Sequence, residues 1–207
     1  MTFRLPEALQ TSDDATAIAL LRRYYGAPYL GAGCADGAHF DTWATDSDPM
    51  RFTADDLLAV KFLSVEAPKT AVRALLRDRA DEFAALLMEL GPDRDLADED
   101  KPLDNSWPGW RLEDKLRLIP GVGRTTASKL LARKRPRLLP IWDIVIRDVT
   151  DTSKDQWEPL RVALRADKLA LHRRLLHLRD ALQLPEEISA LRILDVIAWR
   201  EGKDRSL

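Results

Sequence analysis

The sequence contains a single cysteine, Cys34, among its 207 residues. One cysteine forms no internal disulfide and builds no four-cysteine iron–sulfur or zinc site within one chain. The sequence also lacks an apolar run of about 18 residues, the length that spans a bilayer. Its first residues lack the apolar stretch of a secretory signal. We therefore expect a cytoplasmic protein without a membrane span or a disulfide framework.

Histidine is also scarce, and the three histidines are scattered. His172 and His177 are five residues apart, a spacing that does not place two ligands on one helical face. Gly31 and Gly33 lack the preceding strand and the third glycine of a dinucleotide-binding loop. We therefore expect no resident metal among these side chains and no organic cofactor.

No segment alternates apolar and polar residues as a half-buried strand does, so we expect an all-α protein. Thr53–Asp56 and Ser153–Gln156 are capping-box patterns that indicate helix starts, and Pro185 fits the first turn of the last helix. The spacing of apolar residues predicts helices over residues 15–25, 54–65, 69–90, 110–118, 124–134, 142–149, 157–166, 168–182 and 186–200.

The composition along the chain suggests two parts. Residues 1–52 combine one helix with the loop-rich segment 26–52, and residues 53–207 are expected to form a helical domain. The acidic segment 93–104 is interpreted as a solvated loop, with a lid or a nucleic-acid mimic as alternatives. Five aromatic residues in or beside the loop-rich segment favour core and loop anchors over a base-stacking pocket: Tyr24, Tyr25, Tyr29, Phe40 and Trp43.

The net charge of −2 indicates no partner, but the charges are unevenly distributed. Residues 1–110 carry 11 basic and 20 acidic side chains, whereas residues 111–207 carry 21 basic and 14 acidic ones. Residues 111–137 alone hold nine basic side chains against two acidic ones. Such a concentrated basic segment is compatible with a polyanion on one face of the protein.

The segment 112–131 contains two apolar helical stripes separated by a turn with two glycines. Glycine permits positive φ and leaves no side chain above the turn, so backbone amides can point outward at the start of the second helix. Such amides and the positive end of the helix dipole suit a phosphate. The candidate phosphate-binding residues are Gly121, Val122, Gly123, Arg124, Thr125 and Lys129, and Arg133, Lys134 and Arg135 are expected to extend the basic surface.

This segment, at about residues 111–134, resembles the helix-hairpin-helix motif. The resemblance rests on Ile119-Pro-Gly-Val-Gly123 followed by Thr126-Ala127 and Leu130-Leu131. It implies that the turn holds double-stranded DNA through backbone amides on phosphate, with Val122 at the tip and a possible monovalent cation on the turn's carbonyls. A pair of helices joined by a glycine turn, without DNA, is the alternative.

A second match lies downstream, where Pro140-Ile-Trp-Asp143 places an aspartate 23 residues after Pro120. DNA glycosylases of the endonuclease III and adenine glycosylase type carry an aspartate at this spacing, and residues 57–67 resemble one of their buried helices. The resemblance implies a multi-helix glycosylase-like fold and a catalytic role for Asp143, which would stabilise positive charge on the sugar or activate water after base flipping. Asp143 is also a good N-cap for the helix over 142–149.

The sequence departs from this family at three positions. Thr125 stands where the bifunctional members have a lysine, and a hydroxyl forms no Schiff base, so lyase activity by that route is not expected. Lys61 falls near the place of the adenine glycosylase's helix glutamate. Glu66 stands where a glutamine fills the gap left by the flipped base, and a carboxylate there counts against identical DNA engagement.

The sequence therefore predicts a DNA-binding protein that resembles a monofunctional base-excision glycosylase, as a divergent bacterial member. Two alternatives stay open. One is a non-catalytic DNA-binding or interaction module with the same fold. The other is a protein in which the hairpin is purely structural or contacts another protein.

Overall fold

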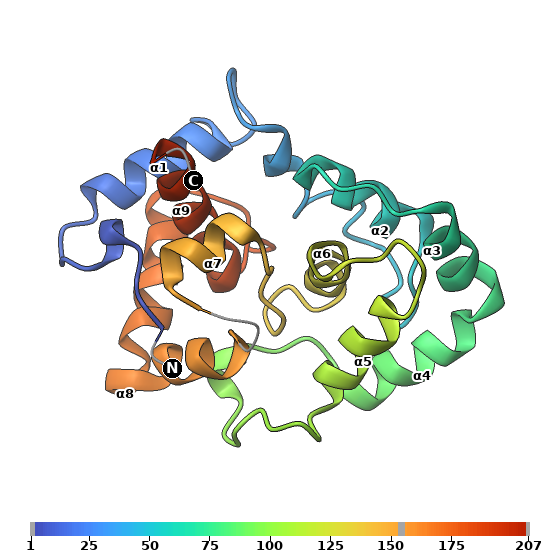
Figure 1. Ribbon diagram of the computed structural model, residues 1–207. Helices are drawn as coiled ribbons and strands as arrows, with labels where there is room; N and C mark the ends of the chain where they lie inside the picture. The colour runs from blue at the N-terminus through green and yellow to red at the C-terminus, as the bar shows by residue number, and fades with distance from the viewer. Residues whose placement is uncertain (1–2, 153–155, 206–207) are drawn as a thin grey trace.

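The computed structural model describes residues 3–152 and 156–205. Over these residues the chain forms helices, turns and short 3-10 segments without any strand, which confirms the all-α class (Figure 1). In chain order the α-helices are α1 (Ala15–Tyr25), α2 (Ala54–Ala59), α3 (Lys69–Arg73), α4 (Ala80–Leu90), α5 (Pro108–Arg117), α6 (Arg124–Lys134), α7 (Ile144–Thr150), α8 (Trp157–Ala181) and α9 (Ala190–Asp204).

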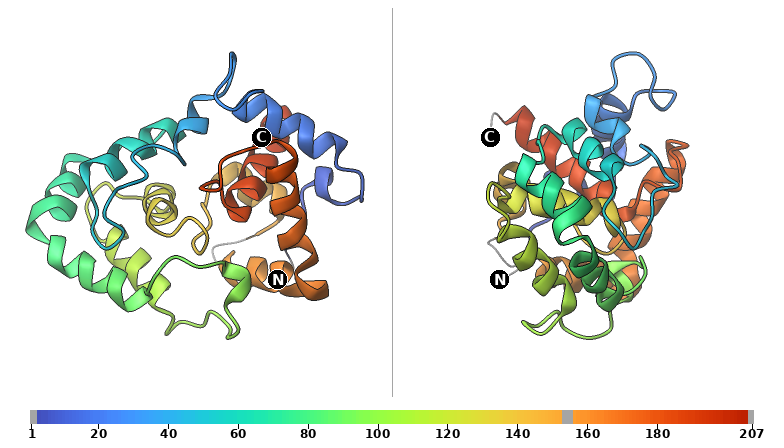
Figure 2. Two further views of the ribbon diagram at one scale, coloured as in Figure 1. Left: turned by 180° about the vertical axis from the view of Figure 1, so that it is seen from behind. Right: turned by 90° about the vertical axis from the view of Figure 1, so that its right-hand side faces the viewer.

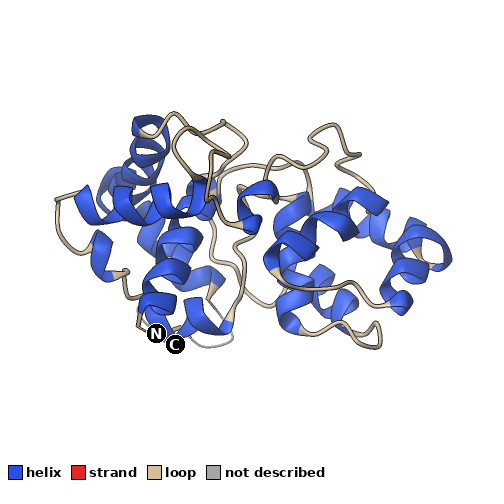
Figure 3. Cartoon of the chain, turned by 90° about the horizontal axis from the view of Figure 1, so that it is seen from above, coloured by secondary structure: helices blue, strands red, loops and turns tan. Residues whose placement is uncertain are grey.

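The helices are arranged as two lobes (Figure 3). In one lobe α9 packs against α1, α7 and α8, so that the first and last parts of the chain lie together (Figure 2). In the other lobe α6 packs against α2 and α5, and α5 packs against α4. Helix α1 therefore lies with the C-terminal helices, and the division expected at residue 52 stays a prediction.

Two long helical patterns are interrupted. The expected helix over 69–90 is α3, a π-helical turn over 74–78 and α4, with Arg79 outside helical geometry at φ −132° and ψ 20°. Within α8, residues 166–169 leave helical geometry, and Asp167 to Leu169 have positive φ. The expected separation into helices over 157–166 and 168–182 is therefore confirmed, although the two run together as one element.

The helix caps follow local polar side chains. Thr53 and Asp56 form the expected capping box at the start of α2. The expectation for Pro185 is wrong, because the last helix begins four residues later, where Ser189 Oγ accepts from the Arg192 amide at 3.1 Å. The capping box proposed at Ser153 lies outside the described residues.

Candidate functional site

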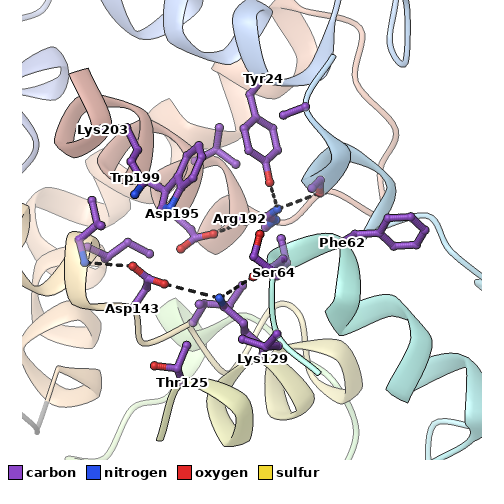
Figure 4. A pocket seen from close by; sticks show the side chains of 18 of the residues that line it. Tyr24, Phe62, Ser64, Thr125, Lys129, Asp143, Arg192, Asp195, Trp199 and Lys203 are labelled. Carbon is purple, nitrogen blue, oxygen red and sulfur yellow. Dashed lines mark hydrogen bonds and ion pairs between the residues drawn. The ribbon is translucent and has the colours of Figure 1, made fainter. Parts of the chain in front are cut away.

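A pocket of about 470 Å³ lies between the two lobes (Figure 4). This volume is within the range of roughly 300–1,000 Å³ that is usual for small-molecule sites. The lobe of α1, α7 and α9 supplies one side, and α6 with the segment after α2 supplies the other. Its polar lining residues include Tyr24, Ser64, Thr125, Lys129, Asp143, Arg192, Asp195 and Lys203.

Asp143 is the N-cap residue of α7, and its side chain lines this pocket. Its Oδ1 accepts from the Val145 amide at 3.0 Å, so the expected N-cap is confirmed. The preceding residue is fixed to α6, because Ser128 Oγ accepts from the Trp142 amide at 3.0 Å and lies 3.1 Å from the Trp142 carbonyl. The Asp143 side chain keeps 18% of its surface exposed. One carboxylate oxygen is thus used for the cap while the side chain still faces the pocket.

Lys129 was expected on the outer surface of α6, where it would contact a phosphate. It lies in the pocket instead. Its side chain is only 8% exposed, and Nζ donates to the Leu63 carbonyl at 2.9 Å and lies 3.5 Å from Asp143 Oδ2. Burial lowers the pKa of Lys129, and the charge of Asp143 opposes this effect. The lysine therefore connects the two lobes through Leu63 and the carboxylate.

Arg124 also lies away from the surface position that we expected. Its side chain is 13% exposed, pairs with buried Glu113 at 3.2 Å, and stacks over the Trp142 ring at 5.3 Å. The pair joins α6 to α5, and the stacking joins α6 to the residue before Asp143. Arg124 therefore connects α6 to Glu113 of α5 and to Trp142, and its charge is paired inside the protein instead of facing a phosphate.

The turn between α5 and α6 has one expected feature and one unexpected one. Gly121 has a φ of +85°, as the glycine pattern predicts. Val122 is buried and its amide donates to the Ile119 carbonyl at 2.9 Å, so the expectation that its amide binds phosphate is wrong. Gly123 is exposed and caps α6 without a side-chain hydrogen bond. The described side chains therefore leave the first-turn amides of α6 open to an anion.

The basic run at the end of α6 does not extend a basic surface, so this expectation is wrong. Lys134 and Arg133 both pair with buried Asp56 of α2. Arg135 is fully buried and donates to backbone carbonyls, including that of Gly91 at 2.7 Å. Neighbouring charges in sequence indicated a surface, but partners far along the chain place these cations in the interior.

Helix α9 supplies pocket-lining residues that sequence reasoning missed. Arg192, Asp195, Trp199 and Lys203 follow one another at helical spacing and line the pocket. Arg192 is buried and pairs with Asp195, with Asp41 at 3.0 Å and with the Tyr24 hydroxyl at 2.6 Å. The signal was present, because two charged residues three positions apart interrupt the otherwise apolar run over 190–198.

The aromatic residues near the loop-rich segment mostly belong to the core, as favoured. Tyr25 and Phe40 are buried, whereas Tyr24 is buried and also lines the pocket. Glu66 points to solvent and pairs with Lys61 at 2.8 Å. This pair partly neutralises the carboxylate that stands in the glutamine position of the family.

Across residues 3–152 and 156–205, no group of three or more His, Cys, Asp and Glu side chains is arranged to hold a metal ion. Across the same ranges, no helix has the length and apolar character needed to cross a membrane.

Comparison with known proteins gives one match. The model of a family described as "Family of unknown function (DUF6308)" matches residues 17–202, which include most of both lobes and all the residues that line the pocket except Lys203. Neither the curated proteins nor the solved structures give a match.

Proposed function

We propose that this chain, which belongs to the DUF6308 family, binds double-stranded DNA and hydrolyses an N-glycosidic bond, with Asp143 as the catalytic carboxylate. The observation that carries the proposal is the position of Asp143. It caps α7 and lines a pocket between two lobes, together with Thr125 and Lys129 of α6, the helix that follows the turn resembling a helix-hairpin-helix.

The chemistry of base excision suits this arrangement. Cleavage of an N-glycosidic bond builds positive charge on the sugar, and a fixed carboxylate nearby stabilises that charge or takes a proton from the attacking water. Asp143 is held by the Val145 amide and lies beside Lys129, so its orientation is set before a substrate enters. The base must leave the duplex stack, and the pocket offers it apolar and aromatic walls such as Val196 and Trp199.

The DNA backbone would contact the outer face of the α5–α6 turn. The amides at Gly123 and the first turn of α6 supply donors, and the side chains of Lys69 and Arg117 are exposed. Thr70 Oγ1 donates to the Pro120 carbonyl at 2.5 Å, which ties the start of α3 to the same turn. The charged contacts of the interface are therefore assigned to Lys69 and Arg117, in place of the buried basic residues of α6.

A matched pair of variants tests the DNA interface. A Cβ at Gly123 meets no heavy atom within 4 Å and the backbone there is extended, so Gly123→Asp and Gly123→Asn both fit and both cap the helix. The two side chains are nearly equal in size, and only that of aspartate is charged. We expect fluorescence anisotropy to show at least about tenfold weaker duplex binding for Gly123→Asp than for Gly123→Asn, with the difference shrinking at high salt.

The same assay separates the alternatives when it uses an intact duplex and one with a stable abasic-site analogue. Tighter binding to the analogue supports an enzyme that flips bases. Equal binding to both supports a non-catalytic DNA-binding module. Equal affinity of the two Gly123 variants, or binding of neither duplex, contradicts the assignment of the α5–α6 turn.

A further inference from the structure

The pocket contains a second carboxyl group, Asp195, that the role of Asp143 does not use. Asp195 lies on α9 and is only 8% exposed. Its Oδ2 pairs with Arg192, while the described residues offer no hydrogen-bond partner to its buried Oδ1. Buried polar atoms without a partner are uncommon in folded proteins and call for an explanation.

We propose that Asp195 is the general acid of this site, which donates a proton from Oδ1 to a ring nitrogen of the departing base, and that the base is a purine. The inference rests on the proposed function. The Arg192 guanidinium fixes Oδ2, so Oδ1 is the oxygen left to carry the proton. Figure 4 shows the Asp195 carboxyl group on α9 pointing into the pocket, toward the side that Asp143 lines.

The surroundings of Asp195 favour its protonated form. Its pKa is raised to about 6, chiefly by burial, with Arg192 and Lys129 lowering it and the charge of Asp143 raising it. A carboxyl group whose pKa is raised in this way is suited to act as the acid of a site. The charged and titratable groups around Asp195 are Arg192 and Tyr24 at the Oδ2 side, Asp41 beyond Arg192, and Lys129 and Asp143 across the pocket.

The step balances without a further reactant. The C1′–N bond breaks, its electron pair moves to the base, and the proton of Asp195 joins the base at a ring nitrogen. Water adds to C1′ and gives its proton to Asp143. The products are the neutral base and the sugar with a new hydroxyl group, and proton exchange with solvent restores the carboxylate of Asp143 and the acid form of Asp195.

A purine fits this step because its imidazole ring has a nitrogen that accepts a proton. The pocket also presents donors to an acceptor-rich edge, namely the Lys129 ammonium and the Tyr24 hydroxyl. Burial raises the pKa of Tyr24 to about 12, so this hydroxyl stays protonated and able to donate. Uracil, which departs as an anion and has no such nitrogen, would gain nothing from Asp195.

Single-turnover base release tests the inference with three kinds of duplex. Hypoxanthine and an adenine–guanine mismatch are neutral purine probes, 7-methylguanine already carries the charge that an acid would supply, and uracil is the pyrimidine probe. We expect Asp195→Asn to slow neutral-purine release by about 100-fold or more and to change 7-methylguanine release by less than about threefold. Asp204→Asn is the matched control, because Asp204 lies on the same helix and pairs with Arg23 outside the pocket.

The pH profile of the unaltered protein gives a second test that needs no variant. Neutral-purine release should fall tenfold per pH unit above about pH 6, as the acid form of Asp195 is lost, and 7-methylguanine release should not show this limb. Equal slowing of both purine classes by Asp195→Asn, an unaffected variant, or the same profile for both classes would overturn the inference while base release itself still supports the proposed function. Preference for uracil would overturn the purine assignment. Failure of the unaltered protein to release any base contradicts the proposed function and the inference together.

Discussion

Replacing Asp143 with asparagine or alanine separates its role as a helix cap from its role in chemistry. Asparagine keeps an oxygen that accepts from the Val145 amide, which Asp143 Oδ1 now contacts at 3.0 Å. Alanine removes this acceptor, and loss of an N-cap costs about 1 kcal/mol. The pair with Lys129 is long at 3.5 Å and Lys129 keeps the Leu63 carbonyl, so its loss adds no more than about 1 kcal/mol.

We therefore expect Asp143→Asn to lie within about 1 kcal/mol of the unaltered protein and Asp143→Ala to lose about 1–2 kcal/mol. Urea denaturation followed by far-UV circular dichroism measures both free energies of unfolding. The slope of the unfolding free energy against urea concentration (the m-value) should be unchanged, because neither substitution alters the surface that unfolding exposes. A loss above about 3 kcal/mol for asparagine would refute this reasoning, since it would mean that the charge of Asp143 holds the lobes together.

Three further substitutions test the account of the fold. Gly121→Ala should cost about 1–2 kcal/mol in a thermal melt, because φ is +85° and the new methyl group would meet Pro68 at 3.2 Å; no loss would mean that the turn has another conformation. Asp56→Ala should cost about 3–5 kcal/mol in urea, because Lys134 would stay buried without a carboxylate, and a loss below 1 kcal/mol would contradict that burial. Asp195 holds its proton in the folded state between about pH 4 and pH 6, where the unfolded chain has lost it, so this group lowers stability as pH rises through that window. The unfolding free energy of the unaltered protein relative to Asp195→Asn should therefore fall by about 2 kcal/mol between pH 4 and pH 7, and a constant difference would show that the pKa of Asp195 is not raised.

The helices around the turn could be predicted because their signals are local. Residues 124–134 form α6 as expected, since glycine before the helix and a regular apolar stripe mark its start and its buried face. The cap at Asp143 was also predictable, because an N-cap bond joins residues two positions apart. The last helix was misplaced because Pro185 and Ser189 both suit a helix start, and only Ser189 has its side chain in place at the amide of Arg192.

The placement of the charged residues could not be predicted, because their partners are distant in sequence. Lys134 pairs with Asp56 and Lys129 bonds to Leu63, and neither contact leaves a trace in the local pattern. The pocket was missed for the same reason, since it brings α9 against residues before α7 and after α2. The known motifs singled out three residues of the pocket, Asp143, Thr125 and Lys129, although the last two were expected on a DNA-binding surface.

The most direct test of the central claim is the release of a free base from duplex DNA by the unaltered protein and by Asp143→Asn. Duplexes that each contain one damaged or mispaired base would be incubated with excess protein, and mass spectrometry would detect the released base. The account predicts release by the unaltered protein and at least about 100-fold slower release by Asp143→Asn, with duplex binding retained. Base release that continues unchanged in Asp143→Asn, or no release from any duplex by the unaltered protein, would contradict it.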